Sequence, residues 1–96
     1  MSNQYARGRA WEYEVRDKLV EHGWWVLRCA GSKSVDLVAF RYGRKPLVVE
    51  CKLRRKPPKK ETEAIRAGLA LLGLRYIVVV KYKKRDTQAV RRPASD

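Results

Sequence analysis

The sequence has few cysteines, few acidic residues and no long apolar run. Its two cysteines, Cys29 and Cys51, form no CxxC pair and are too few for a metal knuckle, so we expect buried, reduced thiols. No apolar stretch approaches the roughly 20 residues that span a bilayer. Residues 1–9 are polar and lack the apolar segment of a secretory signal. These absences predict a soluble protein of the cytoplasm that binds no membrane.

The shortage of acidic residues leaves a large positive charge. Ten Asp and Glu stand against 23 Lys and Arg, which gives a formal net charge of +13 over 96 residues. Such an excess points to a polyanionic partner, and nucleic acid is the leading candidate. At 45% hydrophobic content the chain is long enough for one compact domain over residues 1–96 but not for two. Any larger active assembly must therefore be an oligomer.

Hydrophobic periodicity predicts six elements. We expect helices over residues 10–22 and 61–72 and strands over residues 24–29, 35–42, 47–53 and 76–82. The β-branched run of the last strand predicts burial on both faces and a central place in the sheet. A basic leader is expected over residues 1–9 and a loosely held basic tail over residues 83–96. The order α-β-β-β-α-β predicts an α/β domain with a single mixed β-sheet and flanking helices.

Two charged residues interrupt an otherwise apolar strand in Val49-Glu50-Cys51-Lys52. Because side chains alternate along a strand, Glu50 and Lys52 should share one face. Asp36 begins the strand that a predicted hairpin joins to this one, so its carboxylate should lie at the same end as that of Glu50. Two such carboxylates suit Mg²⁺, or Mn²⁺ in its place. Lys52 would then contact the attacking water or the phosphate of the transition state.

Glu12 is the fourth candidate. Trp11, Val15 and Leu19 recur at helical spacing and should face the sheet. At about 100° per residue, Glu12 flanks this stripe, whereas Glu14 projects toward solvent. An acid at the edge of a buried helix face can reach over a sheet to a metal, so Glu12 is favoured over Glu14.

Each candidate also has a structural interpretation. Glu12 alone would be a surface acid, and Asp36 a turn residue. Glu50 with Lys52 would be an edge-strand ion pair on a solvated face. Their combination on a helix and two paired strands favours catalysis. In Trp24-Trp25, adjacent residues face opposite ways, so only one is expected in the core.

These residues resemble the PD-(D/E)xK nuclease superfamily and, within it, the archaeal-type Holliday junction resolvases. The resemblance is carried by Gly8-x-x-x-Glu12-x-Glu14, His22-Gly23-Trp24, Arg28, Ala30-Gly31-Ser32-Lys33, Val35-Asp36-Leu37-Val38-Ala39 and Glu50-Cys51-Lys52. It covers nearly the whole chain to about Tyr82, and it implies a restriction-endonuclease-like fold.

The resemblance also implies a site and a substrate. The implied metal and catalytic set is Glu12, Asp36, Glu50 and Lys52, with Ser32 matching a family Ser in the loop before the Asp, and the Cys51 backbone carbonyl as a further metal ligand. A homodimer would make symmetric nicks across a four-way DNA junction, with Mg²⁺ and no small-molecule cofactor. The chain departs from the family at Tyr13, where an Arg usually follows the helix Glu, so a phosphate contact is lost or moved.

Basic residues outside this set are expected to contact the DNA backbone. They are Arg7, Arg9, Arg28, Lys33, Arg54, Arg55, Lys56, Lys59 and Lys60. No recognition-helix or zinc-finger pattern occurs, so we expect DNA shape to be read instead of sequence. Two alternatives remain: a nuclease for other branched or damaged DNA, and a non-catalytic basic DNA-binding protein.

Overall fold

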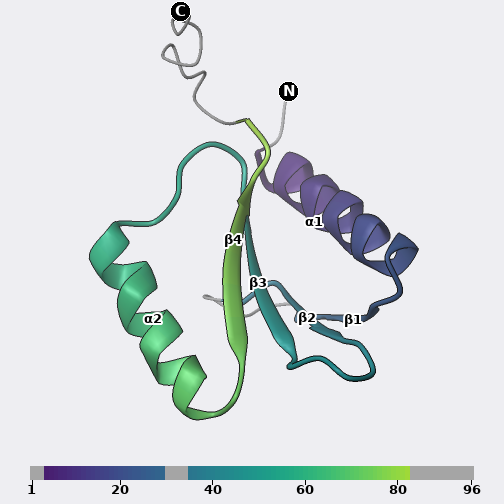
Figure 1. Cartoon of the computed structure of the whole chain (residues 1–96). Coiled ribbons are helices and arrows are strands. Elements are labelled where there is room, and N and C mark those ends of the chain that lie inside the picture. The colour runs from purple at the N-terminus through teal and green to yellow at the C-terminus, as the bar shows by residue number, and fades with distance from the viewer. Residues whose placement is uncertain (1–3, 30–34, 83–96) are drawn as a thin grey trace, which may run out of the picture.

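The computed structural model describes residues 4–29 and 35–82, in which six elements follow one another (Figure 1). They are α1 (Gln4–Glu21), β1 (Trp25–Arg28), β2 (Leu37–Phe40), β3 (Leu47–Lys52), α2 (Lys59–Leu71) and β4 (Arg75–Val80). The order α-β-β-β-α-β confirms the prediction from the sequence. Neither helix of this described part is long and apolar enough to pass through a membrane.

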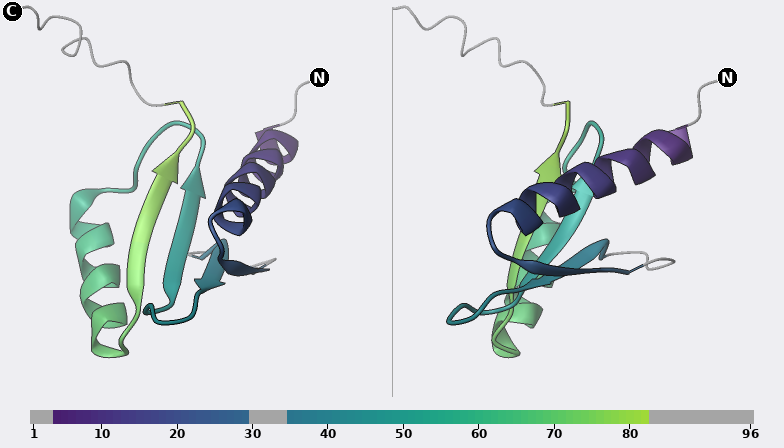
Figure 2. Two further views of the ribbon diagram at one scale, coloured as in Figure 1. Left: turned by 45° about the vertical axis from the view of Figure 1, so that its right-hand side comes forward. Right: turned by 90° about the vertical axis from the view of Figure 1, so that its right-hand side faces the viewer.

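The four strands form one mixed sheet in the order β1-β2-β3-β4. β1 pairs with β2, and β2 with β3, in antiparallel fashion, whereas β3 and β4 run parallel. A parallel pair needs a crossover connection, which α2 supplies here. α1 packs on one side of the sheet, and α2 lies on the other side against β4 (Figures 1 and 2). A single mixed sheet with flanking helices is thus the observed fold class.

The core lies between α1 and the sheet. Leu37 and Ala39 of β2 and Val49 of β3 are fully buried, and Val15 of α1 packs on them. Because side chains alternate along a strand, the chain neighbours of these residues point to the opposite face of the sheet. Glu50 is one of those neighbours, so the packing of one face determines what the other face presents.

The predicted start of the first helix is wrong. α1 begins at Gln4, so most of the predicted leader is helical. Residues 4–9 lack the apolar stripe by which a helix is recognised, but they contain no proline that would prevent one. The Arg9 guanidinium lies over the ring of Tyr5 one turn earlier, 4.8 Å from its centroid. A polar helical turn thus extends the amphipathic part.

β4 is an edge strand of the described sheet, contrary to the predicted central position. Tyr76 is buried, whereas residues 77–80 are half-buried. β4 still carries apolar side chains on both faces, because α2 lies over one face and the margin of the α1 core over the other. A continuous apolar run therefore signals cover on both faces without fixing a strand's place in the sheet. The tail predicted over residues 83–96 lies outside the described residues.

Candidate active site

Asp36 lies directly before β2 and faces β3. Leu37 stands opposite Val49 in the antiparallel ladder. The Asp36 amide donates a hydrogen bond to the Val49 carbonyl (3.0 Å), and the Cys51 amide donates one to Asp36 Oδ2 (2.6 Å). Both the backbone and the carboxylate of Asp36 are therefore fixed to the strand that carries Glu50.

Glu50 is a buried carboxylate with two partners. Only 6% of the residue is exposed. Lys52 Nζ lies 3.2 Å from Glu50 Oε2, and the Tyr76 hydroxyl donates a hydrogen bond to Oε1. The shared face of Glu50 and Lys52 is as predicted. Since β3 has a neighbouring strand on each side and Glu50 is buried, an edge-strand ion pair on a solvated face does not describe this arrangement.

Glu12 approaches from the α1 side of the sheet. Its side chain is 20% exposed, and its Oε1 accepts a hydrogen bond from Arg28 Nε at 3.0 Å. Cys51 lies within electrostatic reach of all three acids. Burial, followed by the negative charges of Asp36, Glu12 and Glu50, raises the pKa of the Cys51 thiol to about 12. The thiol therefore stays protonated at neutral pH.

Asp36 and Glu50 offer a divalent cation carboxylate oxygens from a residue bonded to β3 and from β3 itself. Within residues 4–29 and 35–82, no group of three or more His, Cys, Asp or Glu side chains is arranged to hold a metal ion. Glu12 is instead paired with Arg28. Mg²⁺ is commonly held by one or two carboxylates together with waters and substrate phosphate oxygens. Asp36 and Glu50 thus supply oxygen ligands of the kind that such an ion takes.

Five of the predicted DNA contacts lie where β3 leads into α2. Arg54, Arg55 and Lys56 follow β3, and Lys59 and Lys60 begin α2. All five are exposed. Lys56, Lys59 and Arg66 border a hollow of about 520 Å³ between α2 and β4. Positive charge therefore gathers beside the strand end at which Lys52 stands.

The remaining predicted residues are dispersed. Arg7 is exposed and Arg9 half-buried in the first turns of α1. Ser32 and Lys33 lie outside the described residues, so their predicted roles stay predictions.

Tyr13 marks the departure from the family, and cations gather around it. The guanidinium carbons of Arg16 and Arg28 lie 4.8 and 5.3 Å from the centroid of its ring. Arg28 also holds Glu12, the residue directly before Tyr13. The tyrosine at this position thus has two guanidinium groups over its ring.

Tyr76 reaches the site although the sequence did not single it out. It is 3% exposed on β4 and contacts Glu50 on the neighbouring strand. Burial, together with the hydrogen bond to Glu50, raises the pKa of Tyr76 above its ordinary value, so the hydroxyl stays protonated and donates. The sequence feature that could have identified it is a tyrosine at the start of an aliphatic strand. A buried phenol needs a hydrogen-bond partner, so such a tyrosine indicates a polar group nearby.

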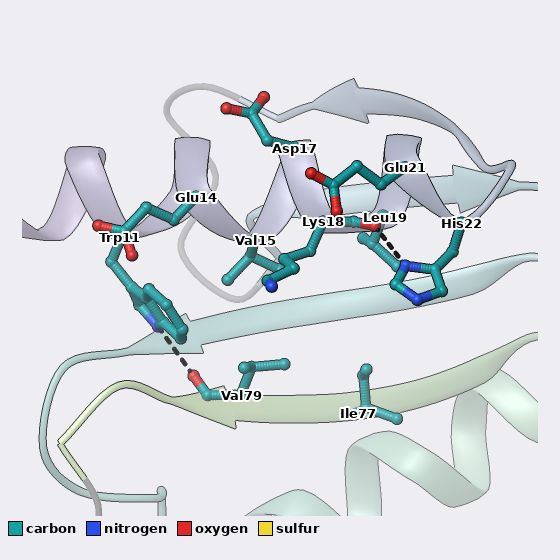
Figure 3. A pocket seen from close by; sticks show the side chains of 10 residues that line it. All are labelled: Trp11, Glu14, Val15, Asp17, Lys18, Leu19, Glu21, His22, Ile77 and Val79. Carbon is teal, nitrogen blue, oxygen red and sulfur yellow. Dashed lines mark hydrogen bonds between the residues drawn. The ribbon is translucent and has the colours of Figure 1, made fainter.

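A separate groove of about 420 Å³ lies between α1 and β4 (Figure 3). Its lining is mostly apolar, and the Trp11 indole donates a hydrogen bond to the Val79 carbonyl across it (3.2 Å). The charged side chains along its rim are Glu14, Asp17, Lys18 and Glu21. This surface lacks the positive excess that a DNA backbone requires, so the groove is not part of the candidate active site.

Comparisons with known proteins agree with this geometry. Residues 3–70 match the profile of the family described as archaeal Holliday junction resolvase (hjc). The chain is 33% identical to the crossover junction endodeoxyribonuclease Hjc of Methanocaldococcus jannaschii, over 85% of this chain and 64% of that protein. It superimposes on the crystal structure of Archaeoglobus fulgidus Hjc, a Holliday junction resolvase, with a TM-score of 0.60 and 26% identity, over 82% of this chain and 66% of that one. The chain thus spans just under two thirds of the length of either relative.

Proposed function

The chain belongs to the archaeal Holliday junction resolvase family, and from this premise we propose that it is a divalent-metal-dependent endonuclease that resolves four-way DNA junctions. The observation that carries the proposal is that Asp36 is hydrogen-bonded to β3, the strand on which Glu50 and Lys52 form an ion pair, with a basic segment directly after it. A protein that acts on such a substrate would work inside the cell.

Asp36 and Glu50, with the Cys51 backbone carbonyl, would hold Mg²⁺, and Mn²⁺ would substitute for it. The ion supplies Lewis-acid polarisation of the phosphodiester and a water of lowered pKa. Lys52 is held beside this position by Glu50 at 3.2 Å. Its ammonium group would stabilise charge on the phosphate and orient the attacking water. Glu12 would orient the water or complete the metal shell.

The basic residues would hold the DNA backbone. Seven of them follow β3 or lie in the first turns of α1, and Arg28 lies in β1; these eight are exposed or half-exposed. Phosphate contacts fix orientation without reading sequence. Selectivity for a junction would then come from its shape and from two sites acting together.

The second site would come from a second copy of the chain. As predicted, one tryptophan of the adjacent pair belongs to the core: Trp24 packs against it, whereas Trp25 is 63% exposed. Trp25 contacts Phe40 with ring centroids 5.9 Å apart, and Leu27 on the same face is 46% exposed. Two copies that each carry +13 repel one another. They would therefore meet across this uncharged face of β1 and β2, which no helix covers within the described residues.

The test is cleavage of a synthetic four-way junction with and without Mg²⁺, by wild type and by Asp36→Asn. We expect paired nicks by the wild type only with metal, and junction binding without cleavage by Asp36→Asn. Asp17→Asn is the matched control, because Asp17 is 66% exposed on α1 and its carboxylate pairs with Arg16 on the same helix. It should cut normally.

Three outcomes would contradict the proposal. If wild type binds the junction with Mg²⁺ but does not cut it, the protein is a DNA-binding protein without catalysis. Preferential cutting of flaps or mismatched duplexes, offered side by side, would indicate the other branched-DNA nuclease. Equal cutting by Asp36→Asn and Asp17→Asn would remove Asp36 from the site.

A further inference from the structure

We propose that Tyr76 is a positioning residue of the active site, which fixes the Glu50 carboxylate in the orientation that binds the metal ion. The inference rests on the proposed function and adds a residue to it. Among the described residues, Tyr76 has a side-chain hydrogen bond to Glu50 but none to Asp36 or Lys52. Its effect would therefore pass through Glu50.

The two oxygens of Glu50 are held separately. Oε1 accepts the hydrogen bond of the Tyr76 hydroxyl, and Oε2 lies 3.2 Å from Lys52 Nζ. With one oxygen fixed by each neighbour, the carboxylate plane cannot rotate without breaking a hydrogen bond or an ion pair. An ionised carboxylate has about four lone-pair positions, and two remain for a cation.

The register of the parallel strands makes this contact possible. Tyr76 stands beside Val48, and Glu50 beside Val78. Tyr76 is therefore one side-chain step behind Glu50 on the same face of the sheet, a separation that a tyrosine side chain can bridge. Only 3% of Tyr76 is exposed, so solvent competes little with Glu50 for the phenol.

Arg66 of α2 holds the tyrosine from behind. Its guanidinium donates a hydrogen bond to the Tyr76 carbonyl (3.3 Å), and its central carbon lies 5.4 Å from the ring centroid. α2 packs against β4. A continuous set of contacts thus leads from α2 through Arg66 and Tyr76 to Glu50, and the second helix contributes to the geometry of the metal site without reaching it.

The experiment measures Mn²⁺ binding by the full chain without DNA, by electron paramagnetic resonance of the free ion. Residues that orient a metal ligand commonly change metal affinity by about 10- to 100-fold. We expect Tyr76→Phe to weaken Mn²⁺ binding by about this factor. Tyr42→Phe is the matched control, since it removes the same hydroxyl from a fully exposed residue, and its affinity should equal that of wild type.

Two further variants separate positioning from folding. Arg66→Gln alters an exposed residue and should weaken Mn²⁺ binding in the same direction but less, by about two- to fivefold for a lost cation–π contact. In a Glu50→Gln background, Tyr76→Phe should have less than about a twofold further effect, because residues that act through one another are not additive. Thermal unfolding of every variant is recorded alongside.

Unchanged Mn²⁺ affinity of Tyr76→Phe would overturn the proposal, as would a loss that is equal with and without Glu50. A lowered unfolding temperature with unchanged affinity would assign Tyr76 a structural role alone. Failure of the proposed function looks different: wild type then binds Mn²⁺ and responds to Tyr76→Phe but does not cut the junction. A wild type that binds no Mn²⁺ overturns both.

Discussion

Replacing Glu50 by Gln separates a catalytic carboxylate from a structural one. The amide keeps the shape of the side chain and can still accept the Tyr76 hydrogen bond, but it loses its charge. At 3.2 Å from Lys52 and an effective dielectric constant of about 20, the lost attraction is at most about 5 kcal/mol. It is smaller in practice, because Lys52 is 41% exposed.

Other contributions of the substitution oppose each other. Weakening the Tyr76 bond from a charged to a neutral one costs about 1 kcal/mol. The Glu50 side chain is only 7% exposed, so burying its charge costs several kcal/mol of desolvation free energy. The neutral amide avoids this cost. The net change in the free energy of unfolding should therefore lie within about 2 kcal/mol of zero, or within about 16 °C in Tm for a chain of this size.

Cleavage should respond very differently from stability. Loss of a charged metal ligand should lower the single-turnover rate on a four-way junction by at least about 100-fold, since second-shell changes alone reach that size. The assay pairs this rate with calorimetric Tm, and Glu63→Gln serves as control because Glu63 is a 60% exposed acid on α2. A Glu50→Gln protein that melts more than about 16 °C lower, or cuts at the wild-type rate, would refute the reasoning.

Two further predictions concern the surfaces. Lys59→Gln and Lys60→Gln should each lower the slope of log affinity against log salt concentration by about 1, measured by anisotropy of a labelled junction; an unchanged slope would take that residue out of the DNA contact. Trp25→Ser should convert a dimer to a monomer in sedimentation equilibrium with little change in Tm, because Trp25 is 63% exposed. A dimer that survives this substitution would place the contact elsewhere, and a monomeric wild type would contradict dimerisation.

The strand-borne part of the site was predictable from local sequence. Alternation alone puts Glu50 and Lys52 on one face, and the short connection between β2 and β3 brings Asp36 to the strand that carries them. Both depend on residues close in the chain. The order of elements was accessible for the same reason, since each element has its own periodicity or turn.

The long-range contacts were not predictable in this way. Which strand lies on the far side of β3, and in which register, depends on the crossover through α2, so the contact of Tyr76 with Glu50 has no local signal beyond an isolated tyrosine. The pairing of Glu12 with Arg28 likewise depends on how α1 crosses the sheet. A side chain can be assigned to a face from sequence, but its partner follows from packing.

Val49 is completely buried and stands directly before Glu50, so one register of β3 determines both the packing of the core and the position of the carboxylate. A slip of β3 by one residue would push the carboxylate into the apolar layer under α1 and put Val49 on the opposite face of the sheet in its place. Such a state would lose core packing and would also bury an unpaired charge. A compact fold with misplaced acids therefore has a high free energy. A molecule that folds into the compact, soluble state therefore also has Glu50 and Lys52 on the correct face of the sheet.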